Sequence, residues 1–433
     1  MRTLRSSRWL AAMLPVLLAA CDMDLTDPNS PNEGPIISTP AGLKQVGVGL
    51  QAEWGNELVD PIYVVGLVTD EVGAIPQAFD SYKNVDAGLE IDNNLGPSTE
   101  PWAGLYDIVQ IANVLLDNVP QVTTLQPGTA SGLIALAKFY KAMAFGHLLQ
   151  IYERIPVAVG LDQLNPEFLT RAAAYDHVLD LLEEARQQLI TTPPSTEFST
   201  EVIAPGFNLE NSINALIARY ALEAGDLALA LAAAQRVPVG SLSEHRFSAS
   251  DPNPVWVMWY NSGNAYRMKA EDQFRTSAQP GDGRVAYWVT EAAIAGAHVP
   301  LDEVARYDTR EESFPVYLPD EMKLIQAEVY ARQNNLAAAL LLLNQVRTQC
   351  TSAVVEPLAC LPPLTLLDVP TQAAMLDAIL LEREYELYLQ GTRWSDLRRF
   401  GEPMKYEFLM VSRSECDSNQ NAPDAVCAVT TVP

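Results

Sequence analysis

Two glutamates, four residues apart on a predicted helix, are the first candidates for acid–base chemistry in this chain. Glu382 and Glu386 would share one helix face. A pair of carboxylates beside arginines could serve as a general acid and a general base. Helical carboxylates flanked by arginines are more often parts of a structural ion network, here with Arg393, Asp396 and Arg398. We therefore expect a structural role for this cluster.

Aromatic and amide side chains gather in residues 60–101 and 238–319, two stretches without clean periodicity. Irregular stretches of that length in a compact body are usually functional. A flat aromatic face covers the apolar C–H groups of a neutral ligand such as a sugar, and neighbouring amides fix its orientation. The ligand-binding candidates are Phe79, Tyr82, Asn84, Tyr260, Asn261 and Tyr266. Each of these alone is more often a packing residue.

Patterns for other chemistry are missing from the sequence. The four histidines lie far apart along the chain, at positions 147, 177, 245 and 298. No H-E-x-x-H, G-x-S-x-G or Walker-type loop is present. We expect no bound metal, no cofactor and no enzymatic activity.

Five cysteines divide into one near the N-terminus and two close pairs. Cys350 lies near Cys360, and Cys416 lies near Cys427. In an oxidising compartment these four should form disulfides, and of the three possible connectivities we favour the two local ones. A zinc site is the rival, but the spacings differ from C-x2-C and no histidine follows His298.

The elements that position these residues are predicted to be mostly helical. Residues 218–237 and 327–346 are similar to each other, and each has a helix, a two-residue turn and a second helix rich in small alanines. This pattern predicts tetratricopeptide-like helical hairpins. Further helices are expected at residues 102–119, 131–152, 172–190 and 371–390. Residues 254–260 alternate and predict one short strand.

The N-terminus has the features of a lipoprotein signal peptide. Three arginines precede an apolar stretch, residues 9–20, which ends in Leu-Ala-Ala before Cys21. That stretch is well short of the ~20 residues that a membrane-spanning helix needs. We expect a signal peptide over residues 1–20, lipidation at Cys21, and a polar tether over residues 21–36. Residues 37–433 would form the folded body.

The strongly acidic composition limits the partners of the chain. It has 28 basic and 54 acidic residues, a net charge of −26. Such a surface repels phosphate backbones and anionic lipid head groups, so nucleic acid is not an expected partner. A neutral ligand fits better.

Several motifs resemble one family, the SusD/RagB outer-membrane lipoproteins. Cys21 followed by Asp24-Leu25 and Pro28-Asn29 is similar to the opening of that family. Residues 137–142 and 152–156 resemble its next helix and the exit from it, although Glu153 and Arg154 replace the usual glycine region. A further helix of the family is matched by Trp102, Tyr106 and Asn113.

The most specific resemblance covers residues 379–401. This segment is similar to the family signature I-x-x-E-R-x-x-E-L-x-x-E-G-x-R-x-x-D-L-x-R, with Gln390 in place of the usual Glu. The matching residues are Glu382, Arg383, Glu386, Gly391, Arg393, Asp396 and Arg398. Gly391 suits a left-handed backbone position after the helix.

The resemblance implies a mostly helical SusD-like fold and a non-enzymatic role in uptake. A protein of this kind would capture a nutrient, an oligosaccharide or a peptide, and pass it to a SusC-like TonB-dependent transporter at the outer membrane. An alternative is a helical-repeat scaffold that binds protein partners only, and a third is a surface hydrolase. The leaflet stays open, because Asp22 after the cysteine is an inner-membrane retention signal in some bacteria.

Overall fold

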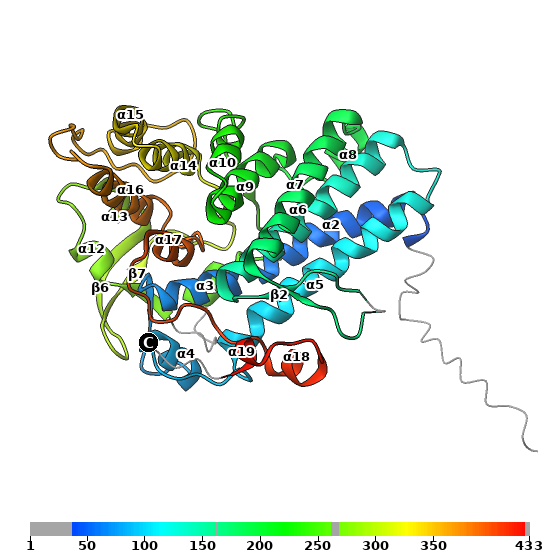
Figure 1. Cartoon of the computed structure of the whole chain (residues 1–433), viewed down its shortest axis with the longest axis horizontal. Coiled ribbons are helices and arrows are strands. Elements are labelled where there is room, and N and C mark those ends of the chain that lie inside the picture. Colours follow the sequence, from blue (N-terminus) through cyan, green and yellow to red (C-terminus); the bar gives the residue numbers. More distant parts are fainter. Residues whose placement is uncertain (1–36, 161–162, 261–267, 429–433) are drawn as a thin grey trace, which may run out of the picture.

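The computed structural model describes residues 37–160, 163–260 and 268–428. Cys21, the predicted signal peptide and the tether lie outside the described residues, as do Asn261 and Tyr266. Figure 1 shows a body built mainly of helices, with short strands gathered on one side. The predicted architecture, mostly helical with long irregular loops and few strands, is confirmed.

Four of the predicted helices are present, each with somewhat different ends. They are α5 (Gly96–Asn118), α6 (Pro127–Ile151), α7 (Arg171–Thr191) and α16 (Gln372–Glu386). Two long helices near the start were not predicted, α2 (Pro40–Glu57) and α3 (Val59–Val68). Because α3 is buried on nearly every side, its sequence has no polar face and no helical periodicity. The region of residues 60–101 is therefore less irregular than expected.

The two predicted hairpins are present. The first consists of α9 (Leu209–Ala224) and α10 (Leu227–Ala234), and the second of α14 (Pro319–Arg332) and α15 (Leu336–Arg347). The turns use left-handed residues, Gly225 with φ 86° and Asn334 with φ 58°. Buried alanines such as Ala230 and Ala339 let the paired helices approach closely.

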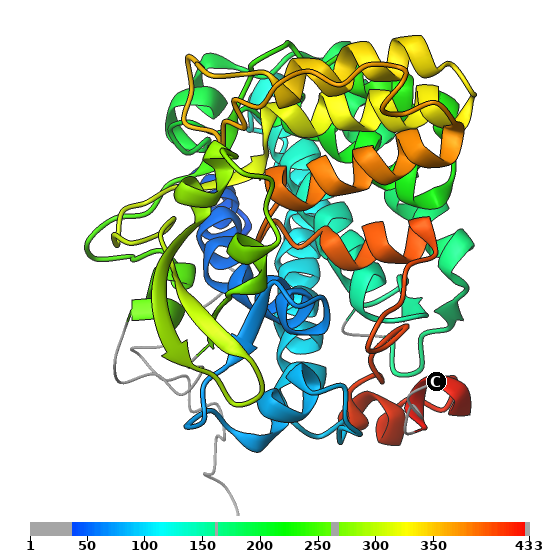
Figure 2. The ribbon, with the colours of Figure 1, turned by 90° about the vertical axis from the view of Figure 1, so that its left-hand side faces the viewer.

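Eight short strands form three small antiparallel sheets among the described residues. The largest sheet has the order β1-β5-β7-β6, from β1 (Val72–Ala74), β5 (Met268–Glu271), β7 (Pro300–Val304) and β6 (Val289–Ala295). Two-stranded sheets pair β2 (Ile155–Pro156) with β3 (Phe168–Leu169), and β4 (Ser243–His245) with β8 (Phe314–Tyr317). Figure 2 shows the β6–β7 hairpin standing beside β1.

The prediction of a strand at residues 254–260 is wrong, because this segment is helix α11 (Pro254–Tyr260). Asn253 Oδ1 accepts a hydrogen bond from the Val255 amide at 2.8 Å, and Pro254 stands at the first helical position. Val255, Met258 and Trp259 are buried at the i, i+3, i+4 spacing of one helix face. Over only seven residues, this helical spacing of apolar side chains is hard to distinguish from the alternation that is typical of a strand.

The remaining helices are short and connect these elements. They are α4 (Asp80–Asp86), α8 (Thr196–Glu201), α12 (Gln273–Thr276), α13 (Gly283–Trp288), α17 (Arg393–Phe400), α18 (Arg413–Ser418) and α19 (Asp424–Cys427), with a 3-10 turn at Val119–Gln121. In Figures 1 and 2, α14 and α15 lie at one end of the body, and α4, α18 and α19 lie at the opposite end.

One large apolar core joins most elements, and a smaller one holds the second hairpin to α16. The smaller core includes Leu324, Ala339, Leu343 and Ile379, all of them fully buried. The structure has two local disulfides, Cys350–Cys360 and Cys416–Cys427. Within residues 37–160, 163–260 and 268–428, no helix is both long and apolar enough to cross a membrane.

Candidate functional site

The largest sheet joins the two irregular regions that supply the ligand-binding candidates. Gly73 of β1 is paired with Lys269 of β5, and Ala74 is paired with Met268. The tip of the β6–β7 hairpin is tied to the same segment, since the Ala297 amide donates to the Ala74 carbonyl at 2.7 Å. This strand pairing brings together segments that are almost 200 residues apart in the sequence.

Two of the candidates are the most exposed aromatic side chains that the structure describes. Phe79 is 59% exposed and Tyr260 is 36% exposed, whereas the other described aromatic side chains are buried or half-buried. Phe79 precedes α4, six residues after Gly73. Exposed aromatic faces of this kind are suited to cover an apolar ligand surface.

Tyr260 is held over the sheet with one ring face beside a lysine. Its hydroxyl donates to the Val304 carbonyl, and Lys269 Nζ lies 5.5 Å from the ring centroid. Lys269 is itself fixed by Glu303, with Nζ 2.6 Å from Oε2. Burial and the nearby acids Glu303 and Asp308 raise the pKa of Tyr260 to about 12, so its hydroxyl stays protonated. The sequence prediction did not include Lys269, because only the strand pairing places it here.

Tyr82 has a packing role and is not available to a ligand. It is 3% exposed, and its hydroxyl donates to Glu100 Oε2 at 2.9 Å. Its ring packs edge-on against Tyr63 and stacks under Phe79 with centroids 6.2 Å apart. Tyr82 therefore supports the exposed ring of Phe79.

Asn84 lines a hollow of about 630 Å³ between α4 and the C-terminal helices. Amide, acidic and basic groups surround it, including Asp92, Asn93, Arg413 and Asp417. Phe79 is not among the lining residues. The three candidates of the first irregular region therefore have different positions. Phe79 is an exposed ring, Tyr82 is a packing residue, and Asn84 lines a polar hollow at the same end of the body.

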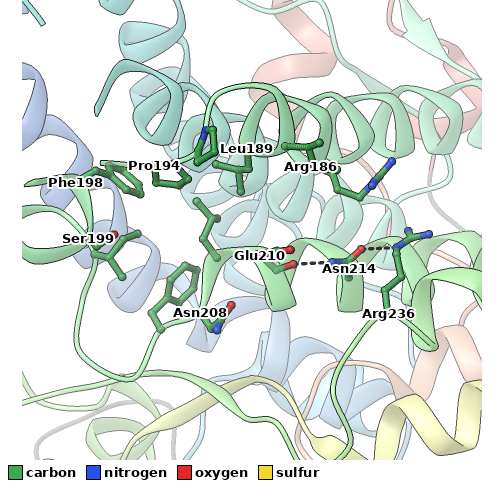
Figure 3. A pocket seen from close by; sticks show the side chains of 14 residues that line it. Arg186, Leu189, Pro194, Phe198, Ser199, Asn208, Glu210, Asn214 and Arg236 are labelled. Carbon is green, nitrogen blue, oxygen red and sulfur yellow. Dashed lines mark hydrogen bonds between the residues drawn. The ribbon is translucent and has the colours of Figure 1, made fainter. Parts of the chain in front are cut away.

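A second hollow, of about 780 Å³, lies between α7, α8 and α9 and contains none of the predicted residues. Figure 3 shows one wall made of apolar side chains such as Leu189 and Phe198. At its other end, Arg236 Nε donates to Asn214 Oδ1 at 2.6 Å, and Asn214 Nδ2 donates to the Glu210 carbonyl at 3.0 Å. All the ligand-binding residues predicted from the sequence lie in the irregular regions, so this hollow on the helical scaffold was missed.

Glu382 and Glu386 are buried away from solvent, at 1% and 0% exposure. Burial raises the pKa of Glu386 well above its usual value, and Asp320 adds to the shift. Glu382 binds Arg284 Nη1 at 2.7 Å and Arg347 Nη1 at 2.5 Å. No substrate could reach this pair, so the geometry agrees with the expected structural role.

The prediction that Arg393 and Arg398 pair with Glu382 and Glu386 is wrong. Arg393 binds Glu384 at 2.7 Å, and Arg398 donates to the carbonyls of Gln150 and Glu407 at 3.1 and 2.7 Å. The true partners, Arg284 and Arg347, come from distant segments that the helical spacing of the signature does not include. Gly391 has φ 68°, the left-handed conformation expected of it.

Asp396 binds two arginines instead of lying near the glutamates. Its carboxylate accepts hydrogen bonds from Arg383 at 2.8 and 2.9 Å and from Arg399 at 2.8 Å. Burial alone would raise the pKa of Asp396, but these two arginines outweigh it and lower the pKa. The charged carboxylate therefore joins α16 to α17.

The signature residues of α5 hold the loop that follows α6. The Tyr106 hydroxyl donates to the Pro156 carbonyl at 2.7 Å, and Asn113 Nδ2 donates to the Val159 carbonyl at 2.9 Å. Trp102 packs edge-on against Tyr152 with ring centroids 5.0 Å apart. All three have the structural role that their place in a helical motif suggested.

Two histidines that are far apart in sequence meet in the core. His147 and His245 lie against Trp54, with ring centroids 5.4 and 6.4 Å from it. Burial lowers the pKa of each to about 3, so both rings are neutral. The cavity beside them is only about 20 Å³, which leaves no room for a substrate.

Comparison with known proteins gives a family and a fold. Residues 246–430 match the model of the SusD family. No curated protein sequence matches the chain. Among solved structures, a SusD superfamily protein from Bacteroides fragilis is similar with a TM-score of 0.70 and 18% identity, covering 89% of this chain and 99% of the other.

Two further structures are similar over nearly their whole length. A SusD-like carbohydrate binding protein from Bacteroides vulgatus has a TM-score of 0.70 and 15% identity, with 91% of this chain and 99% of the other covered. A SusD superfamily protein from Bacteroides thetaiotaomicron has a TM-score of 0.68 and 15% identity, with 88% and 98% covered. The match over residues 246–430 and the shared fold of the whole body both support membership of the SusD/RagB family.

Proposed function

We propose that this protein is a cell-surface lipoprotein that binds a nutrient without transforming it and delivers it to a SusC-like TonB-dependent transporter. The nutrient would be an oligosaccharide or a peptide. The family match and the carbohydrate binding stated for the similar Bacteroides vulgatus protein support the binding role. Residues 37–433 would be one binding body, carried by a tether over residues 21–36 and a lipid on Cys21 after removal of residues 1–20.

The observation that carries the binding site is the exposure of Phe79 and Tyr260. Their rings are the most solvent-accessible aromatic faces of the described chain, and β1 and β5 link the segments that hold them. Neither ring is needed to fill the core. A ligand that covered them would remove apolar surface from water, and nearby polar groups would orient it.

A rival function is a scaffold that binds protein partners only. The hollow of Figure 3 favours it, because that hollow is lined by the helical scaffold and offers an apolar wall with charged groups at one end. Affinity purification of the lipidated protein from native membranes separates the two functions. Recovery of a stoichiometric β-barrel transporter supports uptake, whereas recovery of soluble proteins only supports the scaffold.

Replacing Phe79 by Ala is expected to weaken ligand binding. Loss of the aromatic platform should cost about 1 kcal/mol, roughly fivefold in Kd, with the fold unchanged. Tyr260→Ala should have a similar effect on binding. The measurement is the ligand-dependent rise in Tm across a panel of oligosaccharides and peptides, followed by titration calorimetry of any compound that stabilises the protein.

Leu341→Ala is the matched control for these variants. Leu341 is 63% exposed on α15, at the opposite end of the body, and its loss should leave binding unchanged. Equal affinities of Phe79→Ala and the control would exclude Phe79 from the site. Turnover of any compound in the panel by the purified protein would instead identify a surface hydrolase.

Replacing Cys21 by Ala is expected to release the protein from membranes. A lipoprotein cysteine carries several acyl chains, and without them the acidic body has no attraction for anionic lipid. Fractionation of cells and mass spectrometry of the N-terminal peptide measure this. Asp22→Ser keeps the cysteine and should stay bound to membranes, while equal membrane binding of wild type and Cys21→Ala would contradict lipid anchoring.

A further inference from the structure

Three carboxylates from separate elements meet in a fully enclosed place beside the signature helix. Asp320 begins α14, Glu356 belongs to the loop closed by Cys350–Cys360, and Glu386 ends α16. One oxygen of each lies within 4.8 Å of the others. Their exposures are 1%, 5% and 0%. We call these three residues the buried triad.

Several oxygens of the buried triad have no hydrogen-bond donor. Both carboxylate oxygens of Glu386 and Oε2 of Glu356 are enclosed without one. The nearest cation to Glu386 is Arg284, whose Nη1 is 3.6 Å from Oε2, beyond hydrogen-bonding distance. Enclosed carboxylate oxygens without a partner are costly, because they have lost water and gained nothing in return. The buried triad therefore brings enclosed oxygens without a hydrogen-bond donor close to one another.

The network around the buried triad also has fewer basic groups than acidic groups. Five acids are linked here, the buried triad together with Asp282 and Glu382. Three cations face them, and two of these are paired with the acids outside the buried triad: Arg284 with Asp282 at 2.7 Å, and Arg347 with Glu382 at 2.5 Å. The third, Lys323, binds Asp320. With all five acids ionised, the network has two more negative than positive charges, which one divalent cation would neutralise.

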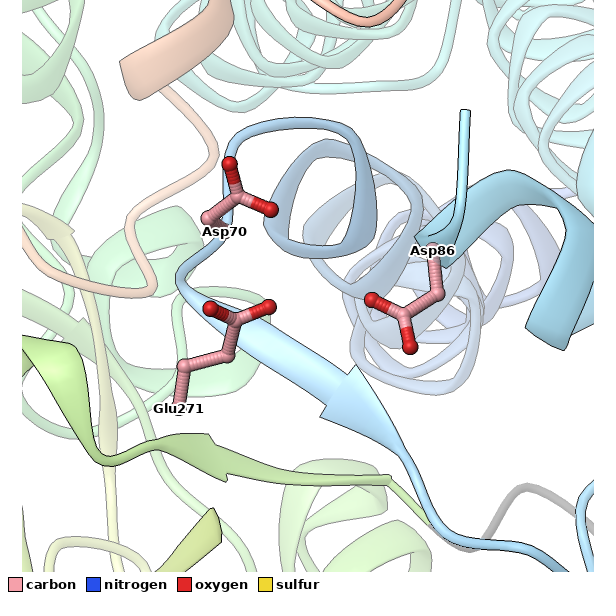
Figure 4. A group of neighbouring side chains, drawn as sticks. All are labelled: Asp70, Asp86 and Glu271. Atoms are coloured by element: carbon pink, nitrogen blue, oxygen red, sulfur yellow. The ribbon is translucent and has the colours of Figure 1, made fainter. Parts of the chain in front are cut away.

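A second acidic cluster, shown in Figure 4, has no carboxylate oxygen that is both enclosed and without a hydrogen-bond partner. Asp70, Asp86 and Glu271 also lie within reach of one another. Lys405 contacts Asp70 directly and lies 3.7 Å from Asp86 Oδ1, and the Asp70 side chain is 43% exposed, so both a lysine and water reach this cluster. Asp86 Oδ2 further accepts the Ala74 amide at 3.0 Å. This cluster serves as the internal comparison.

We propose that the buried triad binds a structural calcium ion. The donors are all oxygens and include neither histidine nor cysteine, which suits a hard cation. Two oxygens on opposite sides of one calcium ion are up to about 5 Å apart, and the spacing of the triad falls within that limit. The ion would tie the disulfide-closed loop of Glu356 to the first turn of α14 and the end of α16. Nothing in this proposal depends on the nutrient or the transporter.

Calcium binding by the full mature chain tests the proposal. After treatment with EDTA, addition of calcium chloride should raise Tm by about 3 °C or more, and titration calorimetry should give one site per chain. Magnesium should have a weaker effect, because its shorter bonds fit the spacing less well. A protein that binds no calcium and shows no rise in Tm with either ion would overturn the proposal.

Charge-removing variants of similar size locate the ion. Glu386→Gln should abolish the calcium-dependent rise, and Glu356→Gln, which changes only the loop, should abolish or greatly reduce it. Glu271→Gln, in the cluster with Lys405, should keep the full rise. The same calcium response in Glu386→Gln, Glu356→Gln and wild type would place the ion elsewhere and contradict the buried triad as its site.

Discussion

Asp396→Ala is expected to destabilise the protein by about 3 to 5 kcal/mol, the usual cost of removing one partner from a buried ion pair. Asp396 is 1% exposed, and Arg383 has no other carboxylate within hydrogen-bonding distance. The variant would leave the Arg383 guanidinium charged, buried and unpaired. The free energy of unfolding from urea titration measures the loss.

The effect should extend beyond one pair, because Asp396 belongs to a chain of charges. Arg399 bridges Asp396 and Glu328, with Nε 2.7 Å from Glu328 Oε1, and Glu328 also binds Arg332 at 2.8 Å. The chain runs from α16 through α17 to α14 of the second hairpin. We therefore expect the unfolding transition of the variant to shift as a whole.

Glu184→Ala provides the comparison for an exposed pair. Glu184 is 60% exposed and binds Lys138 at 2.7 Å. Loss of such a pair costs less than about 1 kcal/mol, because water already screens both charges. A change in the free energy of unfolding of similar size for Asp396→Ala and Glu184→Ala would contradict the structural importance of the signature network.

The parts of the fold that the sequence predicted are those with local signals. Both hairpins have a turn and two helices within about twenty residues, and α6 and α7 are long and periodic. Helix α3 was missed because burial on all sides removes periodicity, and α11 was mistaken for a strand because seven residues hardly distinguish the two spacings. Helices in these places depend on contacts that are distant in sequence.

Contacts that are distant in sequence also limited the prediction of the candidate site. The residue types identified Phe79 and Tyr260, whose exposure agrees with a binding role. Residue type alone could not distinguish Phe79 from Tyr82, because Tyr82 is buried by packing against Tyr63, and its hydroxyl donates to Glu100 on another helix. Pairings such as Arg284 with Glu382, 98 residues apart, follow only from the folded chain.

Stability is expected to fall steeply as the pH rises from about 6.5 to 8. Three acids keep protons in the folded protein, because burial raises the pKa of Asp60, Glu71 and Glu271 to about 8 each. In the unfolded chain the same groups lose their protons near pH 4. Between these values the folded state binds more protons, so a higher pH favours unfolding.

Two buried histidines reduce the pH dependence of stability below about pH 6.5. His147 and His245, with pKa values lowered to about 3 by burial, stay neutral in the fold but gain protons in the unfolded chain below about pH 6.5. That difference makes stability rise with pH up to 6.5, which opposes the acids. Above 6.5 only the acids act, and each extra proton changes the free energy of unfolding by about 1.4 kcal/mol per pH unit.

Urea titrations between pH 5 and 8.5 measure this profile, and Glu71→Gln tests its cause. Glu71 is 5% exposed, its Oε1 accepts the Leu389 amide at 3.1 Å, and its Oε2 has no hydrogen-bond partner. A neutral amide removes one titrating proton, so the variant should lose less stability between pH 6.5 and 8 than wild type. Glu90→Gln changes an exposed carboxylate and should leave the slope as it is. A slope that is unchanged in Glu71→Gln would mean that Glu71 is already ionised in the folded protein, and that its burial is compensated in another way.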